Sequence, residues 1–99
     1  MIPSRVRIKR NAVYNVVYQA EIEGNKHLEG LCVRITVPGE RPVRQIILKK
    51  GMSRTQTELA FIHELIHAIE FEYEIAIPHA LIYLLEAPIH KILKLNDWI

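Results

Sequence analysis

The 99-residue chain contains a single cysteine, Cys32, so it cannot form a disulfide bond within itself. One free cysteine fits a reducing compartment, and we therefore expect a cytoplasmic protein. Cys32 lies in an apolar segment and is interpreted as a core residue. No apolar run approaches the roughly 20 residues that span a bilayer, and the basic N-terminus, Met1–Arg10, contains no apolar run of the kind a signal peptide requires. We therefore expect no association with a membrane.

Aromatic residues make up only 7% of the chain, and there are four glycines. No glycine-rich phosphate loop occurs, and no serine, histidine and aspartate pattern for nucleophilic catalysis stands out. Residues 1–50 hold ten lysines and arginines and four acidic residues, whereas residues 51–99 hold three and seven. A basic half can bind nucleic acid or an acidic protein. Because no aromatic residues alternate with these charges to stack on bases, we expect a solvated sheet face instead.

Four segments of the first half have the residue pattern of β-strands, and turn residues separate them. They are Arg5–Lys9, Val13–Ile22, Leu31–Val37 and Val43–Leu48. Two helical segments follow in the second half. Strands followed by helices indicate an α+β fold. We predict one domain over residues 1–99, with a small antiparallel sheet of three to four strands in residues 1–50 and two packed helices in residues 53–95.

The second half contains the five residues His63-Glu64-Leu65-Ile66-His67, which match the pattern H-E-x-x-H. On a helix, residues four apart share one face, so His63 and His67 can bind one metal ion. Glu64 can then accept a proton from a water molecule on that ion. This pattern is typical of zinc-dependent hydrolases, so we expect Zn²⁺ as the cofactor.

The helix that carries this motif has its own sequence signals. Ser53 and Gln56 form an S-x-x-Q capping box, which satisfies free amides at a helix start. Apolar residues then recur at spacings of three and four, which predicts one buried stripe. They are Leu59, Ile62, Ile66 and Ile69. We expect this helix to end between Phe71 and Glu74.

A zinc hydrolase needs a third protein ligand. Pro78 favours a second helix that starts there and runs back antiparallel to the first. At about 1.5 Å per residue, residues 83–86 of that helix reach the level of His67. Glu86 is therefore the first choice for the third ligand. His79, close to the expected bend, and His90 are the alternatives.

The motif with Glu86 resembles the gluzincin metallopeptidases, which have H-E-x-x-H on one helix and a glutamate ligand on the next. The small size resembles the minigluzincins, which implies a zincin-like catalytic core, and the segment from His63 to Leu85 is similar to small metallopeptidases of bacteriophages. The resemblance covers about residues 53–95. Some relatives, the minigluzincins and the SprT-like proteases among them, use a histidine as third ligand. In the SprT-like pattern this histidine stands at the start of the second helix, and His79 just after Pro78 resembles that position.

Other polar residues have possible roles near the metal. Tyr83 and His90 share a helical face with Glu86, so either could stabilise the oxyanion of the transition state. Glu70 or Glu74 could accept a hydrogen bond from a ligand histidine.

These observations lead to three functional hypotheses. The first is a zinc metallopeptidase with Glu64 as general base, which holds its peptide or protein substrate along a sheet edge formed by Leu31–Val37 or Val43–Leu48. The second is a metal-stabilised protein that binds nucleic acid or an acidic protein through its basic sheet. The third is a phage accessory peptidase that cleaves one particular protein.

Overall fold

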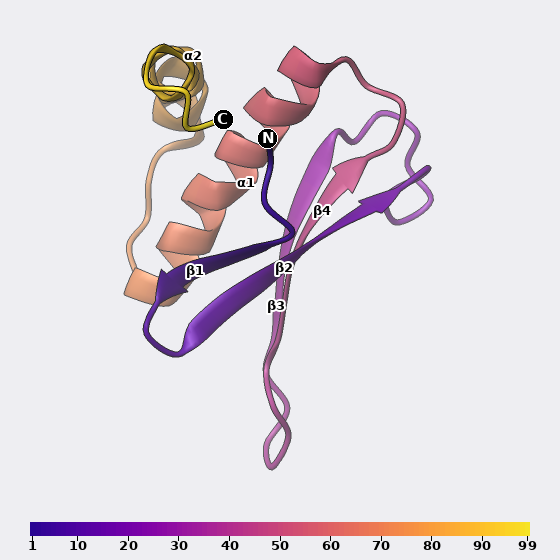
Figure 1. The fold of residues 1–99 in the computed structure, drawn as a ribbon. Helices are drawn as coiled ribbons and strands as arrows, with labels where there is room; N and C mark the ends of the chain where they lie inside the picture. The colour runs from indigo at the N-terminus through magenta and orange to yellow at the C-terminus, as the bar shows by residue number, and fades with distance from the viewer.

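A computed structural model describes all of residues 1–99. The chain forms four strands and then two helices, which confirms the α+β class (Figure 1). The elements are β1 (Arg5–Lys9), β2 (Ala12–Gln19), β3 (Gly30–Ile35), β4 (Val43–Lys49), α1 (Arg54–Tyr73) and α2 (His79–Leu95). Neither helix combines the length and the apolar character that crossing a bilayer requires.

The sheet has the strand order β1-β2-β4-β3, and it is mixed rather than wholly antiparallel. The pairs β1–β2 and β3–β4 are antiparallel, but β2 and β4 are parallel. The reason lies in the connection after β2. Residues 20–29 carry the chain past the position next to β2, so β3 forms at the far edge and β4 returns into the gap. Parallel neighbours need a connection of a dozen residues or more, and residues 20–42 supply it.

Helix α1 packs across one face of the sheet (Figure 1). The main core lies between them and consists of buried side chains from β2, β3, β4 and α1. They are Tyr14, Val16, Cys32, Ile46, Leu48, Ala60, Phe61 and Ala68. Cys32 is thus a core residue, as predicted. Ile2 and Ile99 pack against the same core, so the two chain ends lie close together.

Helix α2 packs against α1 through a separate small core of Ile62, Ile66 and Ile82. Later residues of α2 contact earlier residues of α1, so the two helices run in opposite senses, as expected. The two helix axes are inclined to each other, since in Figure 1 α2 is seen almost end-on while α1 runs across the view. Since the main contacts of α2 are with α1, α1 sets its position.

The two ends of α1 are fixed by specific side chains. At the start, the Gln56 N–H donates to Ser53 Oγ at 3.1 Å and the Ser53 N–H donates to Gln56 Oε1 at 3.2 Å, which is the predicted capping box. At the other end, Glu74 adopts a left-handed conformation with φ 53° and stops the helix. The motif helix therefore has the boundaries that the sequence predicts.

Glu72 fastens the last turn of α1 to the sheet, and its side chain is almost completely buried. Its Oε2 accepts hydrogen bonds from the Tyr14 hydroxyl at 2.6 Å and from Arg44 Nε at 3.0 Å. Burial alone would raise the pKa of Glu72, but the hydrogen bonds from Arg44 and Tyr14 hold it below its usual value.

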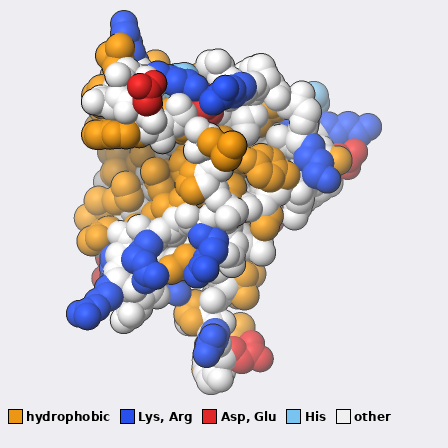
Figure 2. Space-filling model, in the orientation of Figure 1, with side chains coloured by type: hydrophobic (Ala, Val, Ile, Leu, Met, Phe, Trp, Pro, Cys, Tyr) orange, Lys and Arg blue, Asp and Glu red, His pale blue; other side chains and the backbone are white.

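Basic residues of the sheet also bind the carboxyl end of α1 directly. Lys9 Nζ donates to the Glu72 carbonyl at 2.7 Å, and Arg34 Nη1 donates to the Phe71 carbonyl at 2.6 Å. Cations at this end of a helix offset its dipole. Three of the ten basic residues in the first half, Lys9, Arg34 and Arg44, thus bind the end of α1. On the face in Figure 2, lysines and arginines lie in several separate groups.

We expect Glu72→Gln to lower the free energy of unfolding by about 3 kcal/mol at pH 7, because Arg44 would lose its buried partner. The pKa of Glu72 is lower in the folded state than in the unfolded state, where it is about 4.3. Its stabilising effect is therefore complete above that value and is lost as the pH falls through the folded-state pKa. Urea unfolding at several pH values should show parent and variant converging in acid. The exposed Glu74→Gln is the matched control, and a pH-independent difference would contradict this assignment.

Candidate metal centre

Three histidine side chains meet where α2 begins beside the middle of α1. Nε2 of His63 lies 3.2 Å from Nε2 of His67 and 3.1 Å from Nε2 of His79. One nitrogen from each of the three residues lies within 4.8 Å of the others, so the group could hold a metal ion. The H-E-x-x-H pair and one histidine from the next helix therefore share one point in space.

The two nitrogen separations measured from His63 fit a tetrahedral zinc ion. With Zn–N bonds of 2.0–2.1 Å, two nitrogen ligands of a tetrahedron lie about 3.3 Å apart. The two short separations around His63 are close to this length. Imidazole is also a preferred ligand for zinc. Three protein ligands leave a fourth position open, which distinguishes a catalytic zinc site from a closed structural one.

Carboxylates bind the outer nitrogens of both motif histidines. Nδ1 of His63 donates to Oε1 of Glu86, and Nδ1 of His67 donates to Oε1 of Glu70 at 2.8 Å. These bonds fix the tautomer in which Nε2 is free to bind a metal, and such carboxylate partners orient and strengthen histidine ligands. Of the two glutamates considered for this role, Glu70 has it, while Glu74 is exposed at the end of α1.

The third position next to the motif histidines belongs to His79, whereas Glu86 lies behind His63. The prediction of Glu86 assumed that the segment between the helices does not carry the chain back along α1. Residues 74–78 are not helical, and an extended chain covers up to about 20 Å in the six steps from Tyr73 to His79. Returning to the level of His67 takes only about 9 Å along α1. Helix α2 therefore begins level with the motif, and Glu86 lies two turns further on.

Glu70 also holds the segment between the helices. Its Oε2 accepts the Ile77 N–H at 2.8 Å, while its Oε1 accepts from His67. The Ile77 hydrogen bond is the main reason that the pKa of Glu70 is lowered, with a smaller effect from His67. One carboxylate thus orients a candidate ligand and fixes the start of the helix that supplies His79.

Glu64 is buried beside the three histidines, and the edge strand β3 closes over it. Burial raises the pKa of Glu64 to about 7; the nearby His63 and the Cys32 backbone act in the opposite direction, and Glu86 raises it further. A side chain at position 30 would meet Glu64, since a Cβ there would lie 3.0 Å from Glu64 Cγ and Oε2. Gly30 therefore makes room for the carboxylate.

A cleft of about 680 Å³ runs between α1 and the segment His27–Cys32 and contains the three histidines and Glu64. Its wall is formed by β3, which is an edge strand, while β4 lies inside the sheet. Of the two strands predicted to offer a sheet edge, only Leu31–Val37 does so. Tyr83 borders the cleft, with its ring centroid 5.0 Å from that of His63 and 4.9 Å from that of His79.

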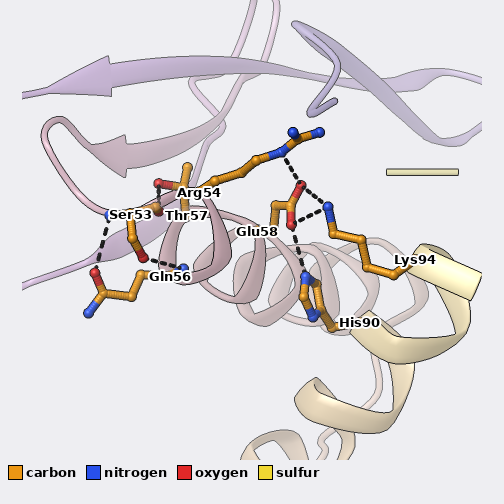
Figure 3. Close-up of polar contacts among 7 residues, drawn as sticks. All are labelled: Ser53, Arg54, Gln56, Thr57, Glu58, His90 and Lys94. Carbon is orange, nitrogen blue, oxygen red and sulfur yellow. Dashed lines mark hydrogen bonds and ion pairs between the residues drawn. The ribbon is translucent and has the colours of Figure 1, made fainter. Parts of the chain in front are cut away.

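His90 does not take part in this centre, contrary to the prediction. Its Nε2 lies 2.9 Å from Oε1 of the buried Glu58, and Lys94 Nζ binds the same carboxylate at 3.0 Å (Figure 3). The pKa of Glu58, which burial alone would raise, is lowered by these two partners and Arg54. Residues 86 and 90 are one helical turn apart. Because α2 crosses α1 at an angle, Glu86 lines the cleft, whereas His90 lies outside it. His90 therefore joins the helices instead.

His27 lines the cleft and was not foreseen from the sequence. It follows a tight turn in which Asn25 Oδ1 accepts the His27 N–H at 2.7 Å. A lone histidine in a polar loop gives no sequence signal, because its place beside the motif depends on where β3 lies in the sheet.

Comparisons of the chain with family models, with curated proteins and with solved structures find no match.

The positions of His79 and Glu86 predict different losses of zinc binding on substitution. We expect His79→Ala to prevent binding of one zinc per chain, because only two protein ligands would remain. Glu86→Gln should weaken binding by about 10–100-fold, as is usual for a residue that orients a ligand. Isothermal titration with zinc measures both affinities. The Glu74→Gln variant is the control, and a larger loss in Glu86→Gln than in His79→Ala would restore Glu86 as the ligand.

We expect Gly30→Ala to destabilise the protein by about 1–3 kcal/mol through overpacking against Glu64. Shortening the carboxylate should relieve this crowding, so Glu64→Asp should cost less in the Gly30→Ala background than in the parent. A double-mutant cycle from urea unfolding measures this coupling. Additive effects of the two substitutions would show that Gly30 does not accommodate Glu64.

Proposed function

We propose that the protein is a zinc-dependent metallopeptidase that hydrolyses peptide bonds. The observation that carries this proposal is the convergence of three imidazole nitrogens beside a buried glutamate, at an open cleft along a sheet edge. His63, His67 and His79 would bind zinc, and the histidine in third place favours the SprT-like pattern over the gluzincin pattern. Zinc, when bound, acts as a Lewis acid and lowers the pKa of its water to about 7.

Glu64 is the general base of the proposed reaction. It neighbours His63 in the chain and lines the same cleft, so it faces the position where the attacking water would lie. Its carboxylate accepts the proton of that water and passes it to the leaving amine. The buried environment between α1 and β3 limits the positions that this carboxylate can adopt, which keeps it aimed at the water.

Two polar side chains of the cleft can donate a hydrogen bond to the developing oxyanion. Tyr83 lies beside His63 and His79, and His27 lies on the opposite wall. Tyr83 is the better candidate, because its ring contacts two of the proposed ligands. Tyr83 therefore remains the proposed stabiliser of the oxyanion.

The edge of β3 is the proposed binding surface for the substrate. An extended peptide can pair with the free edge of a strand through main-chain hydrogen bonds. Gly30 and its neighbours Leu31 and Cys32 line the cleft beside Glu64, so a peptide on this edge would run past the three histidines. The cleft is bordered by α1, by the segment leading into β3 and by α2, and it is open to solvent, which favours an exposed, extended segment of a protein over a folded one.

The second hypothesis, a protein that binds nucleic acid or an acidic partner through a basic sheet, receives less support. Lys9, Arg34 and Arg44 bind the end of α1 rather than facing outward together. A phage peptidase with one protein as its target remains a narrower form of the first proposal, since the open cleft alone would give little selectivity.

We expect Glu64→Gln to keep the fold and to bind zinc within about tenfold of the parent, because residue 64 is not a ligand. Peptide hydrolysis should fall by at least about 100-fold through loss of the general base. A library of unfolded protein substrates, followed by mass spectrometry of new termini, measures the cleavage. His67→Ala should lose zinc and activity together. Equal cleavage by the parent and Glu64→Gln would rule out Glu64 as the base.

A further inference from the structure

The outer face of α2 carries an apolar stripe that nothing in the chain covers. The side chains of Leu81, Leu84, Leu85, Ile92 and Leu95 are 47%, 69%, 44%, 53% and 73% exposed. Pro88 lies among them and is also exposed. They recur at spacings of three and four, which places them along one side of the helix. We call these six residues the α2 stripe.

The opposite side of α2 is also apolar, and it is already used. Ile82, Ile89 and Leu93 belong to the small core with α1, and His79 and Glu86 belong to the candidate metal centre. A helix that is apolar on both sides is usually covered on both sides. Exposed apolar patches of this kind mark interaction sites.

We propose that the α2 stripe binds the same stripe of a second copy, in an antiparallel pair centred on Pro88. Leu81 and Leu95 are each seven residues from Pro88, and Leu84 and Ile92 are each four residues from it. An antiparallel pair therefore places Leu81 of one copy on Leu95 of the other, and Leu84 on Ile92. Such a self-complementary surface is what a two-fold symmetric dimer requires.

The charges next to the stripe are compatible with this arrangement. Lys91 is the exposed charged residue beside it, and the two-fold axis places it against Leu85 of the other copy rather than against a second lysine. Its aliphatic stem can then cover Leu85 while its ammonium group stays in water. Lys94 is bound to Glu58 and does not compete. No like charges oppose one another across the pair.

The size of the stripe predicts a weak dimer. If each of the five aliphatic side chains removes roughly 100 Å² from water, two copies bury on the order of 1,000 Å² in total. This is near the lower limit for specific interfaces. Because His79, Tyr83 and Glu86 lie on the other side of α2, pairing leaves the cleft open.

A lipid surface is the other occupant with suitable chemistry, and the structure favours it less. Helices that lie in a membrane interface have a strongly charged side that faces the head groups. In α2 that side is packed against α1, and Lys91 is the one free cation beside the stripe.

Sedimentation equilibrium of the full chain at rising concentration tests the proposal. We expect a shift from 11.5 kDa towards twice that mass. Leu84→Glu should raise the dissociation constant about tenfold or more. The control is Ile35→Glu, which changes an exposed aliphatic residue on β3. Because both residues are exposed in the monomer, neither variant should change the melting temperature or zinc content greatly.

Disulfide crosslinking tests the register. A mixture of Leu84→Cys and Ile92→Cys chains should crosslink readily, since these positions meet across the axis. Leu84→Cys alone should not, because its two copies lie about 12 Å apart along the helices, too far for a disulfide. The parent, whose Cys32 is buried, is the control.

A parent protein that stays at the monomer mass at all concentrations would overturn the proposal. If that monomer bound anionic vesicles and Leu84→Glu did not, the stripe would be a lipid-binding surface instead. Crosslinking of Leu84→Cys alone as fast as the mixture would contradict the antiparallel pair centred on Pro88.

Discussion

The packing of α2 on α1 is the constraint on which the candidate centre depends, because α1 supplies two of the converging imidazoles and α2 supplies the third. Three separate interactions hold this contact along its length. Glu70 fixes the segment before α2, an isoleucine core lies in the middle, and Glu58 binds His90 and Lys94 beyond it. A buried carboxylate is costly unless it is paired. Glu70 and Glu58 each contact a residue of α1 and at least one residue of α2 or of the segment before it. They therefore favour one crossing angle of the two helices over others.

Local patterns in the sequence were sufficient to predict the elements and the motif helix. Ser53 and Gln56 marked its start, and the histidine and glutamate spacing determined which side chains share its face. These features depend on residues only a few positions apart. The parallel pairing of β2 with β4 could not be predicted in this way, since it depends on where residues 20–29 carry the chain. The class of the fold was therefore predictable, but the order of its strands was not.

The third member of the histidine cluster shows why a site is harder to predict than an element. His79 and Glu86 lie two turns apart on the same side of α2, so helical periodicity alone cannot choose between them. The choice depends on how far the non-helical five-residue segment runs back along α1. The sequence does not determine this distance, which can be anything up to roughly 20 Å. The same helix crossing moves His90 to Glu58 and leaves Tyr83 beside the histidines. One unforeseen segment thus decided the position of all four residues.

The arrangement also links metal binding to the stability of α2. Helix α2 is held on α1 by one small core and a few polar contacts. An ion that binds the folded state alone stabilises it in proportion to the logarithm of its concentration over its dissociation constant. That stabilisation would act on α2 first, because the main contacts of α2 are with α1. Any partner that covers the outer side of α2 would then favour the same docked helix, and so would raise the affinity for the metal.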